Sequence, residues 1–262
     1  MNSHDYSFKD QVAVVTGASS GIGKEIALDF LKSGARVAGV GRRASRDNLL
    51  SDFHEYGKRF LWIRADISRE PDVRRMVRQV LKTFGQIDIL VNNAAVRGPT
   101  TPVATLSAKD WRQVLDTNLT GAFLCARECV KHMIKRRRGR IINISSVAGR
   151  MAYPLRASYA ASKWGLMGFT VTLAQEAGRH GILVNAVCPG PVEGSAIDQV
   201  IAARAEALGI PADKVRQRFL RRAALERMVT SSDVSRTVLF LCSDAARTIT
   251  GQAIDVSAGY RL

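Results

Sequence analysis

Short apolar runs that alternate with amphipathic stretches constrain the fold of this chain most strongly. Nearly continuous apolar runs indicate strands that are buried on both faces of a sheet. These expected strands lie at residues 12–16, 36–40, 60–65, 87–91, 141–144, 183–187 and 253–256. Helical spacing predicts helices at 23–32, 72–83, 108–135, 157–178 and 233–242. Strands that alternate with helices form right-handed crossovers, so we expect an α/β fold with one doubly wound parallel sheet of about seven strands.

One stretch interrupts this alternation. Residues 193–227 follow the sequence Pro189-Gly190-Pro191 and contain two weakly amphipathic segments around Gly209-Ile-Pro211. An insertion at this point overhangs the carboxyl edge of the sheet, where α/β proteins bind ligands. We therefore expect a substrate lid at about 193–227, with a plain surface excursion as the alternative. Residues 1–262 as a whole, the lid included, are expected to form a single dinucleotide-binding catalytic domain without a second domain.

A glycine-rich turn, Thr16-Gly-Ala-Ser-Ser-Gly-Ile-Gly23, joins the first expected strand to the first helix. Gly17 permits the tight turn, Gly21 lets the backbone approach a pyrophosphate, and Gly23 lets the helix pack closely on the strand. The free N–H groups at the start of the helix then face the anion. This arrangement is typical of a Rossmann-like dinucleotide site, although the spacing differs from G-x-G-x-x-G.

Further motifs follow the glycine turn in a fixed order. They are Asn92-Asn-Ala-Ala95, Asn118, Ser146, Tyr159-x-x-x-Lys163, Pro189-Gly190 and Ile249-Thr-Gly-Gln252. With these motifs the chain resembles the short-chain dehydrogenase/reductase family over about residues 8–259. Ala95 departs from the pattern because the family usually has Gly there. The resemblance implies an enzyme that transfers a hydride between a nicotinamide cofactor and a carbonyl or alcohol carbon, and it suggests a homotetramer.

The cofactor preference is predicted from the end of the second expected strand. Twenty residues after Gly21 comes Gly41, with no carboxylate to accept a ribose hydroxyl proton, and Arg42 and Arg43 follow. Two guanidinium groups suit the 2′-phosphate of NADP(H), so NADP(H) is predicted, with NAD(H) as the alternative. Against this prediction, Ser20 occupies a position where many NADP-using relatives carry a basic residue. The alternative interpretation of Arg42 and Arg43 is that they are solvated surface charges that bind no cofactor.

The resemblance extends the cofactor site to other positions. Asp66 and Ile67 are implied to flank the adenine, and Asn92 to lie by its ribose. The remaining positions that the resemblance implies are Ser19, Ile22, Ala94, Pro189, Gly190 and Val192, together with Tyr159 and Lys163.

Tyr159 and Lys163 carry the predicted chemistry. They are four residues apart, so they share a helix face. A phenol is a poor acid or base at neutral pH, and a nearby ammonium lowers its pKa. Ser146 lies 13 residues before Tyr159, which is the family spacing, and it is implied to stabilise charge on the substrate oxygen. Ser145 is the competing candidate. Asn118 is implied to order a water that links Lys163 to solvent, or it is a polar residue satisfied by backbone.

Arginines also occur where the substrate of such an enzyme is expected to bind. Arg97, Arg150 and Arg156 lie after the fourth strand or between Ser146 and Tyr159, and apolar walls come from Met151, Tyr153 and Leu155. We hypothesise that one or more of these arginines binds a carboxylate, sulfonate or phosphate. The alternative is coincidence, because 29 of the 262 residues are arginine.

The net charge of +16 favours anionic partners. The run Lys135-Arg-Arg-Arg-Gly-Arg140 is either a nucleic-acid patch or a set of cations at a helix C-terminus, where the helix dipole favours them. We expect a small-molecule carbonyl or alcohol substrate and no nucleic acid.

The predicted function is therefore an NADP(H)-dependent carbonyl reductase or alcohol dehydrogenase, with an acidic or acyl-carrier-linked substrate as a candidate. The alternative is an NAD-dependent sugar, polyol or secondary-alcohol dehydrogenase. A third interpretation, a catalytically silent scaffold, is disfavoured by the intact set of Asn118, Ser146, Tyr159 and Lys163.

The cysteines and the apolar runs bear on the compartment. Cys125, Cys129 and His132 share a helical face, but their neighbours are apolar, so a packed face is favoured over a metal site. No C-x-x-C pair, signal core or apolar run of about 18 residues is found. We expect a cytoplasmic protein that binds no membrane.

Overall fold

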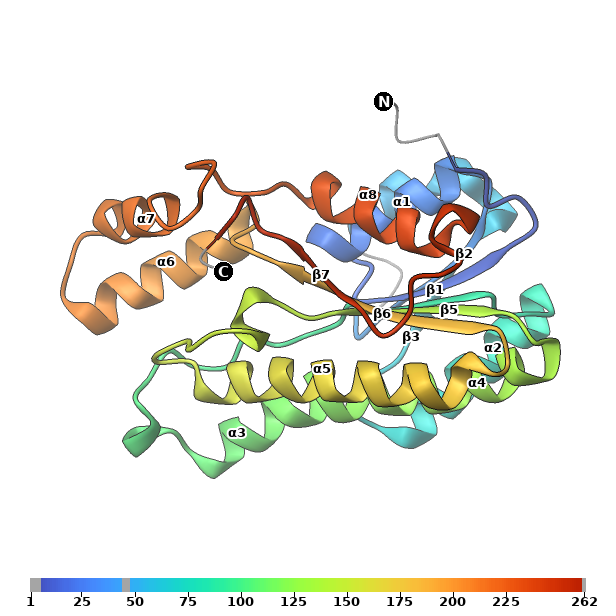
Figure 1. Cartoon of the computed structure of the whole chain (residues 1–262), viewed down its shortest axis with the longest axis horizontal. Helices are drawn as coiled ribbons and strands as arrows, with labels where there is room; N and C mark the ends of the chain where they lie inside the picture. Colours follow the sequence, from blue (N-terminus) through green and yellow to red (C-terminus); the bar gives the residue numbers. More distant parts are fainter. Residues whose placement is uncertain (1–5, 44–47, 261–262) are drawn as a thin grey trace.

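A computed structural model describes residues 6–43 and 48–260 of the chain (Figure 1). Within these residues one parallel sheet has the strand order β3-β2-β1-β4-β5-β6-β7. Its strands are β1 (Val12–Thr16), β2 (Arg36–Gly41), β3 (Phe60–Arg64), β4 (Ile89–Asn92), β5 (Gly139–Ile144), β6 (Ile182–Pro189) and β7 (Ala253–Val256). The predicted α/β fold with a doubly wound parallel sheet is confirmed.

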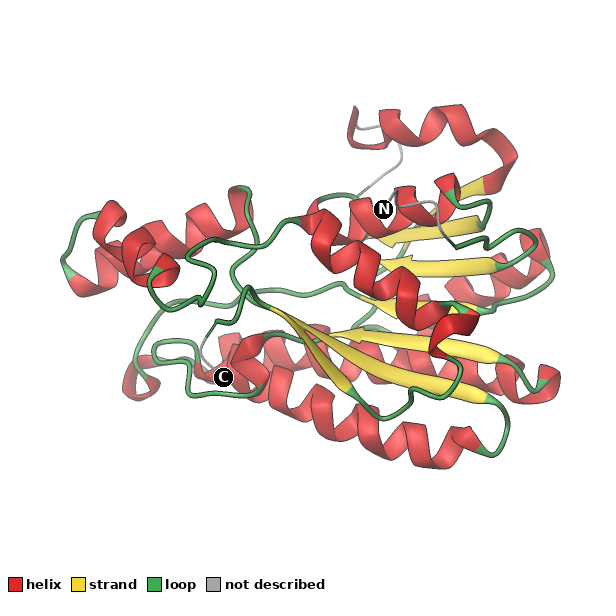
Figure 2. Ribbon diagram, turned by 45° about the horizontal axis from the view of Figure 1, so that its top comes forward, coloured by secondary structure: helices red, strands yellow, loops and turns green. Residues whose placement is uncertain are grey.

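Helices cover both faces of the sheet (Figures 1 and 2). They are α1 (Gly21–Lys32), α2 (Glu70–Phe84), α3 (Ala108–Leu115), α4 (Gly121–Arg136), α5 (Ala157–Gly178), α6 (Ser195–Leu208), α7 (Ala212–Leu220) and α8 (Ser231–Cys242). In β1, Val12 and Val14 pack in the core beneath α2, α4 and α5, while Ala13 and Val15 pack in the core beneath α1 and α8. This alternation explains why β1 reads as a continuous apolar run.

The strand order creates a crevice at the carboxyl edge of the sheet. β1 pairs with β2 on one side and with β4 on the other, so the chain winds away from β1 in both directions. Open α/β sheets bind ligands at such a reversal point. The loops after β1, β4, β5 and β6, which carry the sequence motifs, all open onto this edge.

The segment after β6 forms two helices, as expected from its two amphipathic stretches. α6 and α7 project beyond the sheet at the left of Figure 1. They share a small core of their own, in which Ile201 and Phe219 pack near Tyr260 from the end of the chain. The segment thus lies beside the carboxyl edge, where a lid would lie.

Two local features differ from the expectations. The long helix predicted at 108–135 is present, but a π-helical turn at Asp116–Thr120 lies within it, between α3 and α4. A 3-10 helical segment at Asn48–Arg59 was not expected at all. The predicted start of α3 is confirmed, since the Ser107 hydroxyl accepts a hydrogen bond from the Asp110 N–H.

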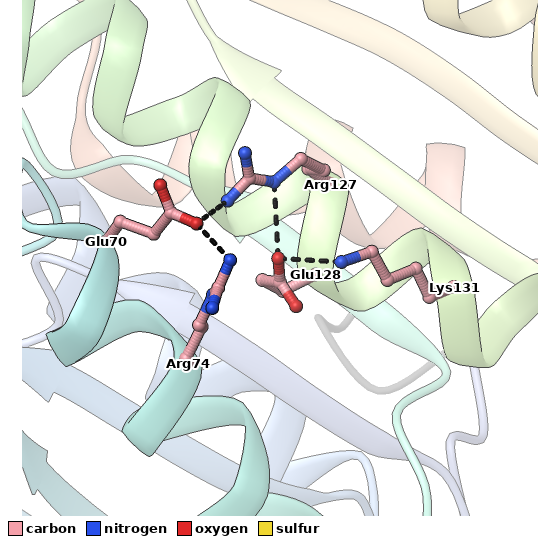
Figure 3. A network of polar contacts seen from close by, with 5 residues as sticks. All are labelled: Glu70, Arg74, Arg127, Glu128 and Lys131. Carbon is pink, nitrogen blue, oxygen red and sulfur yellow. Dashed lines mark hydrogen bonds and ion pairs between the residues drawn. The ribbon is translucent and has the colours of Figure 1, made fainter.

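Polar contacts join α2 to α4 on the surface (Figure 3). The Glu70 carboxylate on α2 contacts Arg127 on α4 at 2.6 Å and Arg74 on its own helix at 2.5 Å. Glu128 lies 3.2 Å from Arg127 and 2.8 Å from Lys131. Each carboxylate therefore serves two cations, which favours the approach of the two helices although partly exposed pairs contribute little individually. No helix in the described residues is long and apolar enough to cross a bilayer.

Candidate active site

A cavity of about 570 Å³ lies at the carboxyl edge of the sheet. Its walls come from the glycine turn after β1, the ends of β2 and β3, the loops after β4, β5 and β6, the start of α5, and α6. Most of the predicted cofactor residues line it: Gly17, Ser19, Ser20, Gly21, Ile22, Arg42, Arg43, Asp66, Ile67, Ala94, Tyr159, Lys163, Pro189, Gly190 and Val192. The dinucleotide turn and the predicted catalytic tyrosine thus share one space.

The glycine turn is shaped as its sequence predicts. Gly17 has a φ of +69°, and a Cβ there would lie 2.8 Å from the Asn93 side-chain nitrogen. A Cβ on Gly23 would overlap the Gly17 carbonyl, so Gly23 serves close packing and does not line the cavity. Gly21 has a φ of +54° and open space where its Cβ would be. The open side of the turn and the start of α1 therefore fit a pyrophosphate.

Asn93 holds this turn in place. Its side chain donates to the Thr16 carbonyl at 2.8 Å, and its backbone N–H donates to the Thr16 hydroxyl at 3.0 Å. Asn92, which the resemblance implied beside the ribose, instead lies 4 % exposed beneath the cavity and donates to Asn143 at 2.9 Å. Asn93 lines the cavity in place of Asn92, since the extended backbone turns successive side chains to opposite sides.

The end of β2 presents positive charge to the cavity. Arg42 and Arg43 are exposed side chains in its wall. Trp62 and Arg64 on β3 donate side-chain hydrogen bonds to their carbonyls and so fix the backbone. Neither guanidinium has an acidic partner among residues 6–43 and 48–260. The cavity wall also carries Asp66, whose carboxylate accepts two hydrogen bonds from Ser68.

Lys163 is a buried cation behind Tyr159. Its ammonium lies 5.6 Å from the centre of the Tyr159 ring and donates to the Ile144 carbonyl at 2.7 Å. Burial lowers the pKa of Lys163 to about 8. The Tyr-x-x-x-Lys spacing thus brings the two side chains together, and the lowering of the Tyr159 pKa by this ammonium stays a prediction.

Tyr159 has opposing influences on its hydroxyl. Burial raises the pKa of Tyr159, and the neighbouring Tyr153 raises it further. A hydrogen bond with the Ser146 side chain and the charges of Arg156 and Arg97 lower that pKa. The contact with Ser146 supports this serine over Ser145, whose hydroxyl donates to the Lys163 carbonyl at 3.1 Å.

Asn118 lies in the π-helical turn between α3 and α4, outside the cavity wall. Its amide oxygen accepts from the Val96 N–H at 2.7 Å, and its nitrogen donates to the Val96 carbonyl and the Ser162 hydroxyl. These bonds join the loop after β4 to α5. The Asn118 side chain thus forms hydrogen bonds with the protein backbone, as in the alternative interpretation. Its implied role in a water relay stays a prediction.

The three arginines expected near the substrate have different surroundings. Arg150 forms an ion pair with Asp255 at 2.6 Å and does not line the cavity, so we no longer place it in the site. Arg97 lines the cavity and donates to the Ala196 carbonyl and to Gln199 on α6. Arg156 and Tyr153 also line it, whereas Met151 and Leu155 do not.

Other site residues were not expected from the sequence. Asn93 adjoins Asn92, which the motifs did indicate, so only the direction of its side chain was missing. Tyr260 and the α6 residues Ile197 and Val200 enter the cavity wall from distant segments. Arg204 stacks on Tyr153, with its guanidinium carbon 4.7 Å from the ring centre, and no motif in the sequence indicated it.

Comparisons with known proteins agree with this geometry. The family described as short chain dehydrogenase matches residues 11–205. A 3-oxoacyl-[acyl-carrier-protein] reductase of Staphylococcus epidermidis is 36 % identical over 250 residues, covering 94 % of this chain and 97 % of the relative. The short chain dehydrogenase/reductase astE of Aspergillus oryzae is 36 % identical over 264 residues, covering 100 % and 98 %. The crystal structure of levodione reductase superposes with a TM-score of 0.89 at 27 % identity, covering 96 % and 98 %.

Proposed function

The chain belongs to the short-chain dehydrogenase family, and on that premise we propose that it is an NADP(H)-dependent reductase of a carbonyl compound, or the dehydrogenase of the corresponding secondary alcohol. The observation that carries the proposal is the single cavity that holds both the glycine turn and the group of Ser146, Tyr159 and Lys163. A cofactor bound along the turn and a substrate bound at Tyr159 would meet in this space.

Each residue has a distinct role in the proposed reaction. When bound, the reduced nicotinamide cofactor supplies a hydride to the carbonyl carbon. The Tyr159 hydroxyl donates its proton to the carbonyl oxygen, and the Ser146 hydroxyl donates a hydrogen bond to the same oxygen while charge develops on it. Lys163 stabilises the phenolate that Tyr159 leaves behind. Asn118 is a positioning residue, because it holds the loop after β4 against α5.

The state of Tyr159 favours reduction at neutral pH. Because burial raises the pKa of Tyr159, its hydroxyl keeps the proton that reduction consumes. Alcohol oxidation needs the deprotonated form instead, so the oxidation rate rises as pH increases toward that pKa. The positive charge of an oxidised nicotinamide would lower the pKa from its value in the free protein.

The preference for NADP(H) rests on Arg42 and Arg43. Both line the cavity without an acidic partner in the described ranges, and a phosphate supplies the missing negative charge. We expect the double change of Arg42→Ala and Arg43→Ala to lower kcat/KM for NADPH by about 10- to 100-fold and to leave kcat/KM for NADH within a few-fold. Initial rates with both cofactors measure this, and Arg78→Ala on the exposed face of α2 is the matched control. A tenfold preference of the unchanged protein for NADH would contradict the proposal and favour the alternative of an NAD-dependent alcohol dehydrogenase.

The names of the relatives suggest where a substrate search begins. A 3-oxoacyl group on an acyl carrier protein and levodione are the substrates that appear in the names of the reductases that this chain resembles. The side of the cavity near the lid is formed by apolar residues of α6 and by the aromatic rings of Tyr153 and Tyr260. A panel of ketones, oxo acids and oxoacyl thioesters with each cofactor is therefore the first screen.

A further inference from the structure

Arg156, at the start of α5, is a buried cation without a counter-charge. Its side chain is 3 % exposed, and its guanidinium carbon lies 5.4 Å from the centre of the Tyr159 ring. Two of its nitrogens donate to neutral oxygens, the Arg97 carbonyl at 2.8 Å and the Thr100 hydroxyl at 3.3 Å. Its Nε atom is buried and has no hydrogen-bond partner in the described structure. Burying a charge in this way costs folding free energy that these contacts do not recover.

Two further arginines strengthen the positive charge at this point. Arg97 and Arg204 lie close enough to Arg156 to lower the pKa of its guanidinium, although burial is the larger cause. The buried Nε atom of Arg204 also lacks a partner. None of the three forms an ion pair with an acid in residues 6–43 and 48–260, and this includes Asp66 and Glu193, the acidic residues of the cavity wall.

The surface network of Figure 3 contains an arginine that is less buried than Arg156 and does have acidic partners. Arg127 is 31 % exposed and still contacts the carboxylates of both Glu70 and Glu128. Arg150 likewise pairs with Asp255. By contrast, Arg156 has the most deeply buried guanidinium of the cavity wall and forms no ion pair with a carboxylate in the described residues. Its charge is also the least screened, because buried surroundings screen charge less than water does. The negative charge that it lacks is therefore expected from a ligand.

We propose that the substrate carries an oxyanion, a carboxylate or a phosphate, and that Arg156 binds it beside Tyr159 within the field of Arg97 and Arg204. This inference rests on the proposed function, since it assumes that the carbonyl group lies at Tyr159 and Ser146. A planar guanidinium can bind two oxygens of one anion at once, which a lysine cannot do. Because Arg156 adjoins the Tyr159 ring, the oxyanion lies close to the reacting carbonyl. The substrate class is thus a short oxo acid or an oxo-alkyl phosphate, and in reverse the matching hydroxy compound.

Matched pairs of compounds test the proposal. The full chain is assayed with NADPH on 4-oxopentanoate against its methyl ester, and on dihydroxyacetone phosphate against dihydroxyacetone. We expect the anion of at least one pair to have the higher kcat/KM by tenfold or more, and the pair identifies the carboxylate or the phosphate. Arg156→Gln should lower the ratio of kcat/KM for the anion to kcat/KM for its neutral partner by about 10- to 100-fold. Arg156→Lys should lower this ratio by less, because lysine keeps the positive charge but cannot bind two oxygens of one anion at once. Arg78→Gln on α2 is the charge-matched control and should leave the ratio unchanged.

The ratio separates this role from two others. If Arg156 only supports the fold or only lowers the pKa of Tyr159, Arg156→Gln reduces turnover of the anion and its neutral partner equally, and the proposal is overturned. Equal kcat/KM for both members of both pairs in the unchanged protein overturns it as well. Calorimetric binding of pentanoate and of methyl phosphate, which carry no carbonyl, provides a readout without turnover. The unchanged protein could bind these anions, lose that binding on Arg156→Gln, and still reduce no carbonyl compound. That result would refute the proposed function and support the anion site.

Discussion

The buried ammonium of Lys163 connects stability to catalysis at the scale of single residues. Its side chain is 3 % exposed and has one recorded hydrogen bond, to the Ile144 carbonyl. Burial lowers its pKa from 10.5 to about 8, so the folded protein holds this proton less firmly than the unfolded chain does. At neutral pH the buried charge of Lys163 therefore lowers the free energy of unfolding. We interpret this loss of stability as the consequence of placing a cation beside Tyr159 for catalysis.

Replacing this lysine is expected to stabilise the protein. At pH 7, Lys163→Met should raise the free energy of unfolding by at most about 3 kcal/mol, since the desolvation penalty of the charge disappears. The gain should shrink as pH rises from about 8 to 10.5, because the unchanged protein then gains stability as its buried amine loses the proton. Urea unfolding at pH 7 and pH 10 measures this, with the exposed Lys214→Met as control. A variant that is less stable at pH 7 would show that the Ile144 hydrogen bond outweighs desolvation.

The sequence predicted which residue types form the site better than it predicted where their side chains point. Tyr159 and Lys163 share a helix face because helical geometry alone places residues four apart together. Asn92 and Asn93 are adjacent and chemically identical, so no local signal tells which of them lies in the core and which holds the turn. The absence of an acid beside Arg156 is a property of three-dimensional packing, and spacing along the chain does not contain it.

At the scale of elements, accuracy followed the strength of the local pattern. The bounds of α5 agree with the expected 157–178, and those of β1 with 12–16. The helix expected at 108–135 contains a π-helical turn that the sequence did not indicate, where Asn118 bonds to both the N–H and the carbonyl of Val96, a tertiary contact. The segment at Asn48–Arg59 carries Phe53 and Tyr56 at helical spacing, so it had an amphipathic signal that the sequence analysis did not use, although Gly57 interrupts its helical backbone.

Contacts that the sequence did not indicate attach the segment expected to form a lid to the rest of the site. Arg97, from the loop after β4, donates to the Ala196 carbonyl and to Gln199, and so joins α6 to the rest of the site. On the other side, Arg204 of α6 stacks on Tyr153. The arginines that surround the proposed oxyanion therefore also contact α6 or belong to it, and we propose that binding of an anion and closure of α6 favour each other.

At the scale of the whole molecule, exposed apolar side chains on α3, α4 and α5 support the homotetramer that the family resemblance implies. Trp164 and Val171 on α5 are 53 % and 51 % exposed, and Phe123 on α4 and Trp111 on α3 are 40 % and 37 % exposed. Trp164 and Val171 are seven residues apart, so they lie on one helix face. Exposed apolar side chains grouped on neighbouring elements are typical of protein interfaces.

We propose that this surface joins the subunits of the tetramer, and light scattering after size exclusion tests it. The unchanged protein should elute with four times the subunit mass at micromolar concentration, and Trp164→Glu should shift it toward dimers or monomers by burying a charge in the interface. Leu225→Glu, an equally exposed apolar position in another segment, is the matched control. A monomeric protein, or a Trp164→Glu variant that keeps its mass, would contradict the proposal.

Proposed binding sites and a helix end account for part of the high positive charge of the whole molecule. Arg42 and Arg43 are proposed to hold a cofactor phosphate, and Arg97, Arg156 and Arg204 to surround a substrate oxyanion. The run from Lys135 to Arg138 lies at the end of α4, where the helix dipole favours cations. Arg74, Arg127 and Arg150 form ion pairs with carboxylates.

Turnover by a variant that lacks only the Tyr159 hydroxyl tests the central claim most directly. Tyr159→Phe keeps the ring that stacks beside Lys163 and Arg156 and removes the proton that reduction consumes. We predict that single-turnover rates with bound NADPH fall by about 10²- to 10⁴-fold, the usual contribution of a general acid, while fluorescence titration gives an NADPH Kd within a few-fold of that of the unchanged protein. A variant that binds NADPH normally and reduces the carbonyl at a near-normal rate would show that the chemistry is not performed by Tyr159.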